Sequence, residues 1–533
     1  MGEPSGLHLD VGPLGPERSQ PLDADARSPL RSYAPATGEL LGEVPTTSDD
    51  EVRHAVARAR KAQAAWAVLP VRERAQRMLR LRDALADRAE DIVEVVSREC
   101  GKPRHEALVH ELTTLLHLIT WSCARAPELL AAERVPLQLV VHRASEVHFV
   151  PRGVVGVLSP ANYPLLIPMG AVVTALLAGN ACVVKPSELT PLTLLEAKRA
   201  YDSTGLPEDL FAVVLGRGDV GQRLVEAGID YCVFTGGVET GRKVAAACGA
   251  RLVPCTLELG GKAPLIACED CDLERTARAI VMGAFANSGQ VCVSVERVYA
   301  HERVYEPLLA RVRDLVGELR QGDPSRDFVD VGAIISPRQI DVVQRLVDDA
   351  LAKGARLVCG GGKPATEALR GGRFYEPTVL AECSHTMAVM REESFGPVVP
   401  FMCVKSDDEA IALANDSDLG LNAYVFTRDR ARGRRLAERL QTGSVVVNDV
   451  LSNYATVEAP FGGVKHSGFG RIHGADGLRE MCHRKHVSVD RIAPPPGDLF
   501  WYPYTQTSFH WLQRGVRLLF GGGGWTKKIA ELL

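Results

Sequence analysis

The sequence lacks a strong excess of charge of either sign. Its 533 residues carry a formal net charge of -4, and the pI is about 6.4. A marked basic excess is typical of nucleic-acid-binding proteins and of proteins that anionic membranes attract as a whole. Neither class follows from this balance, and we expect no nucleic-acid partner. The length favours two or three domains.

An organised cysteine framework is also missing. The thirteen cysteines are an odd number in a long chain, which indicates reduced thiols and a cytoplasmic protein rather than a set of disulfides. Cys268 and Cys271 form a C-x-x-C pair, but no second pair or neighbouring histidine completes the ligand set of a zinc site. The sequence therefore predicts no metal site.

No segment has the pattern of a secretory signal. The N-terminal residues are rich in Gly, Pro and charge and lack an apolar core, so we expect a flexible tail over residues 1–28. The long uncharged run at 165–184 has the length of a membrane span. Pro168 and the Gly179–Asn180 pair interrupt it, which predicts a buried helix over 167–178 and then a short buried strand.

Short apolar runs alternate with helical stretches along most of the chain. The first helix is expected after Thr47 or Ser48, because hydroxyl N-caps there precede three acidic residues. From residue 151, β-rich runs such as GVVGVLS, ACVVK and YCVFTG are separated by helical stretches, and the alternation resumes after residue 258. This order predicts an α/β fold with parallel, doubly wound sheets in two domains.

The C-terminal residues 491–533 differ from the rest. A stiff proline run precedes a helical pattern whose apolar face holds Phe509, Leu512, Val516, Leu519 and Phe520. The favoured interpretation is a helix docked on the protein's own body or on a sister subunit. A peripheral membrane contact is the less favoured alternative.

Seven short motifs occur along the chain. They are PANYP at 160–164, KPSE at 185–188, FTGGVETG at 234–241, LELGGK at 257–262, GQVC at 289–292, EESFGPVV at 392–399 and PFGGVKHSGFGR at 460–471. Each is weak alone, but in this order and spacing they resemble the NAD(P)-dependent aldehyde dehydrogenase superfamily of the non-acylating, hydrolytic type. The resemblance implies an enzyme that oxidises an aldehyde to a carboxylic acid.

The resemblance also implies a Rossmann-like cofactor domain, a second α/β catalytic domain and a β oligomerisation arm. Because such an arm adds strands to a neighbour's sheet, a homodimer or homotetramer is expected. The expected boundaries are 1–28 for the tail, 29–136 with 151–257 for the NAD-binding domain, 258–455 for the catalytic domain, 137–150 with 483–490 for the arm and 491–533 for a C-terminal extension.

Three residues match the family's catalytic positions. An aldehyde must accept a nucleophile before it can release a hydride, and a cysteine thiolate attacks well and leaves well from a thioester. Cys292 of GQVC is the implied nucleophile, and the Asn162 side chain with the backbone N–H of Cys292 would hold the oxyanion. Glu258 would activate the water that hydrolyses the thioacyl enzyme.

A further group matches the family's cofactor contacts. A carboxylate can bind ribose hydroxyls but repels a 2′-phosphate, so Glu188 favours NAD, with NADP as the alternative. GGVETG resembles the turn and helix start beneath the pyrophosphate, where N–H groups and the helix dipole meet the anion. The implied contacts are Lys185, Ser187, Glu188, Gly236, Gly237, Gly241, Glu393 and Phe395.

Two positions depart from the family's pattern. Ala161 replaces a usual aromatic residue, which opens space at the pocket's edge, and Gly237 replaces a usual serine, which removes a hydroxyl near the cofactor. Val291 and Val293 suggest an apolar throat. On a strand-like segment their side chains would face away from that of Cys292.

Three alternative interpretations stay open. A CoA-acylating aldehyde dehydrogenase would pass the acyl group to a thiol, but such relatives generally lack the glutamate present here as Glu258. An inactive homologue kept for binding or structure would be expected to lose Cys292, Asn162 or Glu258. The third is an enzyme that acts on long-chain aldehydes at a membrane, and it depends on the aromatic C-terminal helix.

Overall fold

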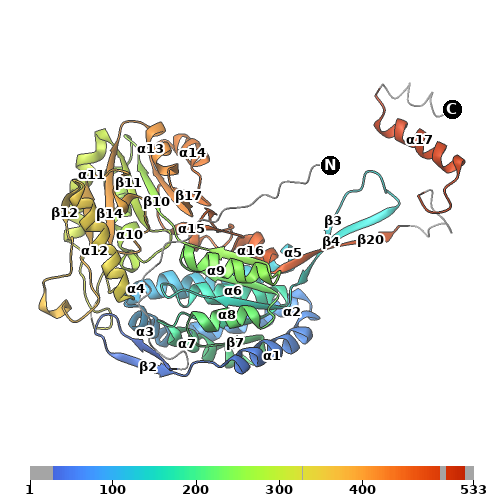
Figure 1. Cartoon of the computed structure of the whole chain (residues 1–533), viewed down its shortest axis with the longest axis horizontal. Coiled ribbons are helices and arrows are strands. Elements are labelled where there is room, and N and C mark those ends of the chain that lie inside the picture. Colours follow the sequence, from blue (N-terminus) through green and yellow to red (C-terminus); the bar gives the residue numbers. More distant parts are fainter. Residues whose placement is uncertain (1–27, 327, 492–499, 523–533) are drawn as a thin grey trace, which may run out of the picture. The chain divides into compact units, whose positions relative to one another are not determined.

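The structure is a computed structural model that describes residues 28–326, 328–491 and 500–522 (Figure 1). The predicted tail over 1–28 lies outside the described residues except for its last residue. The chain divides into two units. The first comprises the described residues up to Leu130 together with Pro151–Cys482, and the second comprises Ala131–Val150 together with the described residues from His483 onward.

The first unit contains a six-stranded sheet whose strand order reverses beside β5. On one side of β5 lie β6 and then β7, and on the other side lie β8, β9 and the antiparallel β19. In open α/β sheets, ligands bind outside the carboxyl ends of the strands at such a switch point. The strands are β5 (Val154–Leu158), β6 (Ala181–Lys185), β7 (Phe211–Val213), β8 (Tyr231–Thr235), β9 (Cys255–Glu258) and β19 (Gly468–Phe469).

Helices surround this sheet (Figure 1). The uncharged run forms the predicted buried helix, α6 (Leu166–Ala178), which ends at the left-handed Gly179 before β6 begins. α4 (Arg104–Glu106) continues through a π-helical turn at Ala107–Thr113 into α5 (Thr114–Leu129). The others are α1 (Asp49–Ala67), α2 (Val71–Asp87), α3 (Ala89–Cys100), α7 (Pro191–Asp202), α8 (Gly218–Glu226), α9 (Val238–Ala250) and α16 (Gly474–Glu480).

A second sheet of the first unit has seven strands, parallel except for β12 at one edge. Their order is β12 (Arg356–Cys359), β13 (Thr378–Ala381), β14 (Val398–Val404), β11 (Val295–His301), β10 (Ala263–Ala267), β16 (Asn422–Phe426) and β17 (Ser444–Val447). Alternate side chains of β10 point to opposite faces, so Leu265 and Ile266 belong to different buried apolar clusters. The mixed α/β architecture with parallel sheets is therefore confirmed.

Five helices complete the two apolar clusters of the second sheet (Figure 1). One cluster takes its helical side chains from α10 (Leu273–Phe285) and α11 (Glu302–Gly317), and the other from α12 (Pro337–Ala352), α13 (Asp407–Asn415) and α14 (Arg430–Arg439). Within the described ranges, every helix is too short or too polar to cross a membrane. The small elements are β1 (Leu30–Tyr33), β2 (Leu40–Val44), β15 (Leu419–Gly420), β18 (Val464–Lys465) and α15 (Ser452–Ala455).

The second unit contains a three-stranded sheet and one helix. The strands are β20 (Cys482–Asp490), β4 (Arg143–Pro151) and β3 (Glu133–Arg134), and the helix is α17 (Gln506–Phe520). The Arg143 guanidinium joins β4 to β20, because it donates to Ser488 Oγ at 2.8 Å and to the Asp490 carboxylate at 2.7 Å. The predicted arm, 137–150 with 483–490, falls within this unit, and its role in assembly stays a prediction.

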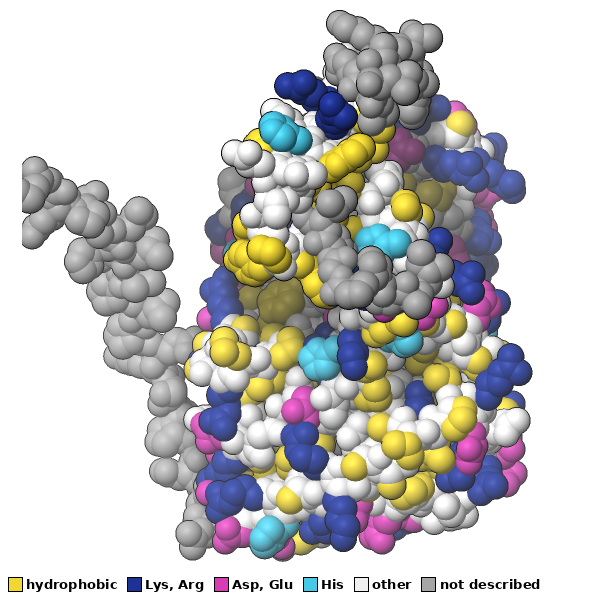
Figure 2. Space-filling model, turned by 90° about the vertical axis from the view of Figure 1, so that its right-hand side faces the viewer, with side chains coloured by type: hydrophobic (Ala, Val, Ile, Leu, Met, Phe, Trp, Pro, Cys, Tyr) yellow, Lys and Arg dark blue, Asp and Glu magenta, His cyan; other side chains and the backbone are white. Residues whose placement is uncertain are grey.

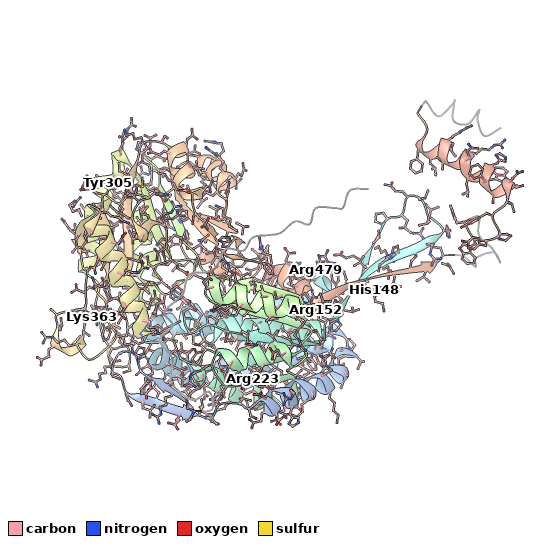
Figure 3. The ribbon with its side chains drawn as sticks, viewed as in Figure 1. His148, Arg152, Arg223, Tyr305, Lys363 and Arg479 are labelled. Atoms are coloured by element: carbon pink, nitrogen blue, oxygen red, sulfur yellow. The ribbon has the colours of Figure 1, made fainter. Side chains whose placement is uncertain are left out.

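Two arginines of the first unit fix the segments that lead to the unit boundary (Figure 3). Arg152 lies over the Tyr231 ring, 4.3 Å from its centroid, and its Nε donates to the Glu480 carbonyl at 2.6 Å. Arg479 on α16 donates to the Leu129 carbonyl at 3.1 Å. These bonds fasten segments that are far apart in sequence to one body.

The start of α1 gives a stability prediction. The Ser48 hydroxyl accepts from the N–H of Glu51, and the Glu51 carboxylate accepts from the N–H of Ser48 at 2.8 Å. Ser48→Ala should lower the free energy of unfolding by about 1 kcal/mol, because it removes this capping box. Thermal unfolding should show a lower Tm. Thr120→Ala, which removes an exposed hydroxyl from α5, should leave Tm nearly unchanged, and equal Tm shifts in the two variants would contradict the prediction.

Candidate active site

Cys292 lies in a turn between α10 and β11 and not on a strand. The turn contains three consecutive left-handed residues, Asn287 at φ 49°, Ser288 at φ 56° and Gly289 at φ 75°. Gly289 cannot carry a side chain, because a Cβ there would stand 2.1 Å from the Gly396 carbonyl oxygen. The strand-like alternation expected around Cys292 is therefore wrong, since these residues turn the chain before β11 begins.

Two cavities meet at Cys292, and Ile167 is the other residue that lines both. The first, here called the polar cavity, has a volume of about 360 Å³ and lies beside the carboxyl ends of β5, β8 and β9. This is the switch point of the first sheet. Of the predicted site residues it is lined by Asn162, Glu258, Gly236, Gly237, Glu393 and Phe395 as well as Cys292.

The second cavity, here called the apolar cavity, has a volume of about 200 Å³. Val291 and Val293 line it together with Cys292, as do Leu166 and Met282. Among the described residues that line it, none is Lys, Arg, Asp or Glu.

Histidine is the basic side chain in the lining of the apolar cavity. His110 stands on the π-helical turn, and burial lowers its pKa to about 4, so it is uncharged near neutral pH. The cavity therefore offers no cation to a charged ligand.

Asn162 follows β5 and is buried against the Cys292 turn. Its side-chain Nδ2 donates to the Gln290 carbonyl at 2.9 Å. Its own carbonyl accepts from Lys102 Nζ at 2.6 Å and from Asn287 Nδ2 at 3.0 Å. The amide and the turn that carries the thiol are thus held by one set of hydrogen bonds.

A buried ion pair supports this arrangement, and the sequence motifs did not reveal it. Lys102 and Glu111 are fully buried, with 2.6 Å between Nζ and Oε1. The other Glu111 oxygen accepts from the N–H groups of Leu165 and Leu166, at the start of α6. Lys102 directly follows the glycine that ends α3, so in sequence it resembles an ordinary helix terminus.

A second buried carboxylate binds the backbone of the Cys292 turn. Glu106 accepts from the N–H of Asn287 at 2.7 Å, and burial raises the pKa of Glu106 to about 7. Gln290 closes the turn through its Nε2, which donates to the Asn287 carbonyl at 2.9 Å. The Gln290 Oε1 accepts from the N–H of Ile335, which ties the turn to a neighbouring segment.

Glu258 ends β9 and is buried with no hydrogen-bond partner, among the described residues, for either carboxylate oxygen. Burial raises its pKa well above the ordinary value, and the charge of Arg471 opposes the shift. A buried, unpartnered carboxylate that lines a cavity can accept a proton from a ligand or a water there.

The same loss of solvent acts on the thiol. Burial raises the pKa of Cys292 to about 12, and the nearby charges of Glu393 and Glu258 add to the shift. Cys292 is therefore a thiol near neutral pH in the chain alone, and a proton acceptor is needed to form the thiolate.

Glu393 and Phe395 are positioned by a second buried ion pair, between Lys262 and Glu296, with 2.6 Å from Nζ to Oε2. The Glu296 carboxylate accepts from the N–H groups of Ser394 at 2.7 Å and Phe395 at 3.0 Å. Glu393 itself accepts from the N–H of Gly261 at 3.0 Å. Burial first, and then the charge of Glu296, raises the pKa of Glu393 to about 8.

Glycines bring backbone close to the polar cavity. Gly237 is the N-cap of α9, so the free N–H groups and positive dipole end of that helix lie at this cavity. Gly241, one turn into α9, packs on Leu259, whose Cδ2 would be 2.5 Å from any Cβ. These residues form a site suited to an anion.

Lys185, Ser187 and Glu188 stand at the carboxyl end of β6, but they do not line the polar cavity. Lys185 is buried, its Nζ donates to the carbonyls of Pro186 and Gly216 at 2.8 Å, and burial lowers its pKa. The Ser187 hydroxyl accepts from the N–H of Leu189, a residue that does line the cavity. Glu188 lies 3.7 Å from Lys185 and is 44% exposed, which leaves its carboxylate open to a ligand.

The residues present fit a dinucleotide better than a metal. Backbone N–H groups at a helix start suit a pyrophosphate, and the carboxylates of Glu188 and Glu393 suit ribose hydroxyls. Among the described residues, no group of three or more His, Cys, Asp or Glu side chains is placed to hold a metal ion.

Comparisons with known proteins agree with this geometry. A model described as the aldehyde dehydrogenase family matches residues 22–487. A 4,4'-diapolycopene aldehyde oxidase of Methylomonas sp is 38% identical over 496 residues, which cover 92% of this chain and 91% of that protein. A putative NADP(+) succinate-semialdehyde dehydrogenase of Mycolicibacterium smegmatis is 40% identical over 481 residues, which cover 89% and 92%.

A solved structure shares the fold. The aldehyde dehydrogenase of Mycobacterium tuberculosis complexed with NAD+ matches with a TM-score of 0.82 and 34% identity, over 86% of this chain and 94% of that one.

The Lys102–Glu111 pair generates a prediction. Lys102→Met should lower the free energy of unfolding by about 3–5 kcal/mol, because it leaves the Glu111 carboxylate buried without a counter-charge. Chemical denaturation measures the loss. Lys102→Met combined with Glu111→Gln should recover at least half of it, since the glutamine keeps an acceptor for the two N–H groups. A double variant no more stable than the single one would show that the charge is not the cause.

Proposed function

The chain belongs to the aldehyde dehydrogenase family and oxidises aldehydes to carboxylic acids with NAD(P), and we propose that it does so through a covalent intermediate on Cys292. One observation carries the proposal. A thiol, a side-chain amide and a buried carboxylate without a partner line one cavity, in the residues Cys292, Asn162 and Glu258. The resemblance seen in the seven motifs is confirmed at the level of the family.

The first proposed step joins Cys292 Sγ to the aldehyde carbon. The thiol proton passes to the Glu258 carboxylate, which burial makes a stronger base than it would be in water. The carbonyl oxygen becomes an oxyanion, which accepts hydrogen bonds from Asn162 Nδ2 and from the N–H of Cys292. Asn162 is pre-positioned for this role, because Lys102 and Asn287 hold its backbone carbonyl.

In the second proposed stage the thiohemiacetal carbon loses a hydride and becomes a thioester carbon. NAD(P), when bound in the polar cavity, supplies the hydride acceptor. Glu258 releases the thiol proton to solvent and then takes a proton from water, the hydroxide oxygen bonds to the thioester carbon, and the bond from carbon to Sγ breaks. The carboxylic acid leaves, and the Cys292 thiolate takes the proton from Glu258.

The cofactor contacts are part of the same proposal. We assign the pyrophosphate to the glycine-rich start of α9, the adenosine ribose to Lys185, Ser187 and Glu188, and the nicotinamide end to Glu393 and Phe395. Gly241 allows α9 to pack closely on Leu259. The partly exposed Glu188 favours NAD, while the relative named for NADP(+) keeps the second cofactor as the alternative.

The apolar cavity supports an aldehyde with an apolar body. A carboxylate buried in this cavity would have no cationic partner among the described lining residues, which costs several kcal/mol. Of the two relatives, the one named for 4,4'-diapolycopene aldehyde fits this lining better than the one named for succinate semialdehyde. We therefore propose an uncharged, apolar aldehyde as the substrate.

Assembly and compartment complete the proposal. β20 and β3 form the edges of the three-stranded sheet in the second unit, and we assign the predicted arm, 137–150 with 483–490, to the assembly of a homodimer or homotetramer. All thirteen cysteines are unpaired thiols, which supports a cytoplasmic enzyme.

The roles of Cys292 and Glu258 can be separated by kinetics. Cys292→Ala should abolish NADH formation, whereas the exposed Cys403→Ala should retain it. Glu258→Gln should slow both the first turnover and the steady state, the latter by roughly 10²–10⁴, because both proposed proton transfers then lack their base. A Glu258→Gln enzyme whose first and later turnovers keep the natural rate would contradict both roles of Glu258.

The same pair gives a pH prediction. Glu258 is active as the carboxylate, and burial raises its pKa, so the steady-state rate should rise with pH through that raised value and level off above it. Glu258→Gln should lack this limb of the profile. Free coenzyme A should leave the product a carboxylic acid, and an acyl-CoA product would favour the acylating alternative.

Substrate preference is testable with a matched pair of aldehydes. The value of kcat/KM should be at least tenfold higher for a straight-chain alkyl aldehyde than for succinate semialdehyde, because the cavity has no cation. Met282→Arg places a cation at the rim of the apolar cavity and should narrow or reverse this ratio. Leu252→Arg, on an exposed surface outside both cavities, should leave the ratio unchanged.

A further inference from the structure

Residues 500–522, here called the aromatic segment, expose an unusual amount of apolar surface. Nine of its large apolar side chains are at least half exposed, and no residue of α17 is buried. Burial of a single aromatic side chain of this kind is worth about 1.5–3 kcal/mol, so a partner surface would gain much by covering them. They are Phe500, Trp501, Tyr502, Tyr504, Phe509, Trp511, Val516, Leu519 and Phe520.

The first turn of α17 is stabilised by hydrogen bonds within the aromatic segment itself. The Thr505 hydroxyl accepts from the N–H of Ser508 at 3.0 Å, and the Ser508 hydroxyl accepts from the N–H of Thr505 at 3.0 Å. A capping box of this kind stabilises the first turn of a helix. The helix therefore presents an ordered apolar surface.

The charge of the aromatic segment differs from that of the whole chain. Residues 500–522 contain Arg514 and Arg517 and no acidic residue, although the chain carries a net charge of -4. The sequence continues with Lys527 and Lys528, and three of its five tryptophans are at 501, 511 and 525. Tryptophan and tyrosine beside basic residues are typical of the interface between a bilayer and water.

The distribution of side chains around α17 favours a fluid surface over a protein groove. Successive residues of a helix are 100° apart when viewed along its axis. In this view the apolar side chains of α17 form one sector of roughly 200°, bounded by Leu518 and Phe520, and Arg514 and Arg517 lie outside it. A protein groove covers a narrower stripe and would leave Trp511 in water, since it lies about 200° from Phe509. A helix that lies among lipid headgroups is also covered on its sides, so that Trp511 would be buried too.

We propose that the aromatic segment docks this enzyme on the surface of a bilayer that contains anionic phospholipid. Its fifteen-residue helix is about 22 Å long, shorter than the hydrocarbon core, so it lies along the surface. The apolar side chains enter the headgroup layer, and the arginines meet lipid phosphates. Figure 2 shows hydrophobic side chains gathered with Lys, Arg and His in the upper part of the view.

A substrate link rests on the proposed function. An apolar aldehyde partitions into lipid, so an enzyme held at the bilayer would meet it at a raised local concentration. The docking itself does not depend on that link.

Flotation with vesicles tests the docking. The full-length chain should float with vesicles of phosphatidylcholine and phosphatidylserine and bind phosphatidylcholine vesicles at least several-fold less. Phe509→Ser with Phe520→Ser should reduce the partition onto the mixed vesicles at least tenfold, because two aromatic side chains are lost from the contact. Phe328→Ser, which removes an even more exposed phenyl ring outside the aromatic segment, should float like the natural chain. Arg514→Gln with Arg517→Gln should remove most of the preference for phosphatidylserine.

Two outcomes would overturn the proposal. One is a natural chain that stays in the dense fraction with both vesicle types. The other is equal flotation of the natural chain and the double serine variant. A segment docked on its own body or on a second copy would give the first outcome, and the serine variant would then lower Tm or change the mass in solution. NADH formation from propionaldehyde in the absence of vesicles should be the same in the natural chain and the serine variant, which separates this test from that of the proposed function.

Discussion

Removal of water from a carboxylate and a thiol in one cavity is the constraint on which this site depends. Burial raises the pKa of both Glu258 and Cys292, so each group resists its charged form, and neither Glu258 oxygen has a hydrogen-bond partner among the described residues. In water the two groups would differ widely in acidity, and the thiol would rarely lose its proton to the carboxylate. In the cavity the carboxylate is a stronger base than in water. The same residue can therefore serve in both proposed proton transfers, from the Cys292 thiol and from water.

Such a site requires rigid surroundings, and two buried ion pairs provide them, one among the helices that surround the first sheet and one at the second sheet. Lys102 with Glu111 holds the loop of Asn162, and Lys262 with Glu296 holds the loop of Glu393 and Phe395. In both pairs the carboxylate also accepts from two backbone N–H groups, so the charge is shared with the loop that it positions. Each loop is thereby fixed by the interior of the unit rather than by solvent-exposed contacts.

Features that depend on short sequence patterns could be predicted from the sequence. Features that depend on contacts between residues far apart in the chain could not. Alternating apolar runs gave the two parallel sheets, and the motifs brought Cys292, Asn162 and Glu258 to one cavity. Lys102, Glu111 and Glu296 could not be found in this way, because a buried ion pair leaves no mark near either partner in the chain. The turn at 287–289 was also missed, since two of its three left-handed residues are not glycine and only packing holds them there. The placement of Lys185, Ser187 and Glu188 outside the cavity lining depends on how loops pack, which no local pattern shows.

The meeting of two cavities at Cys292 has a consequence for how this chain can change. Their linings share only Cys292 and Ile167 among the described residues, so the walls proposed to face the cofactor and those proposed to face the aldehyde are almost separate sets of side chains. A substitution at Met282 or Val293 can change the shape of the apolar cavity without changing the side chains that line the polar cavity. New substrate preferences can therefore arise by single steps, each of which leaves an enzyme that still binds its cofactor.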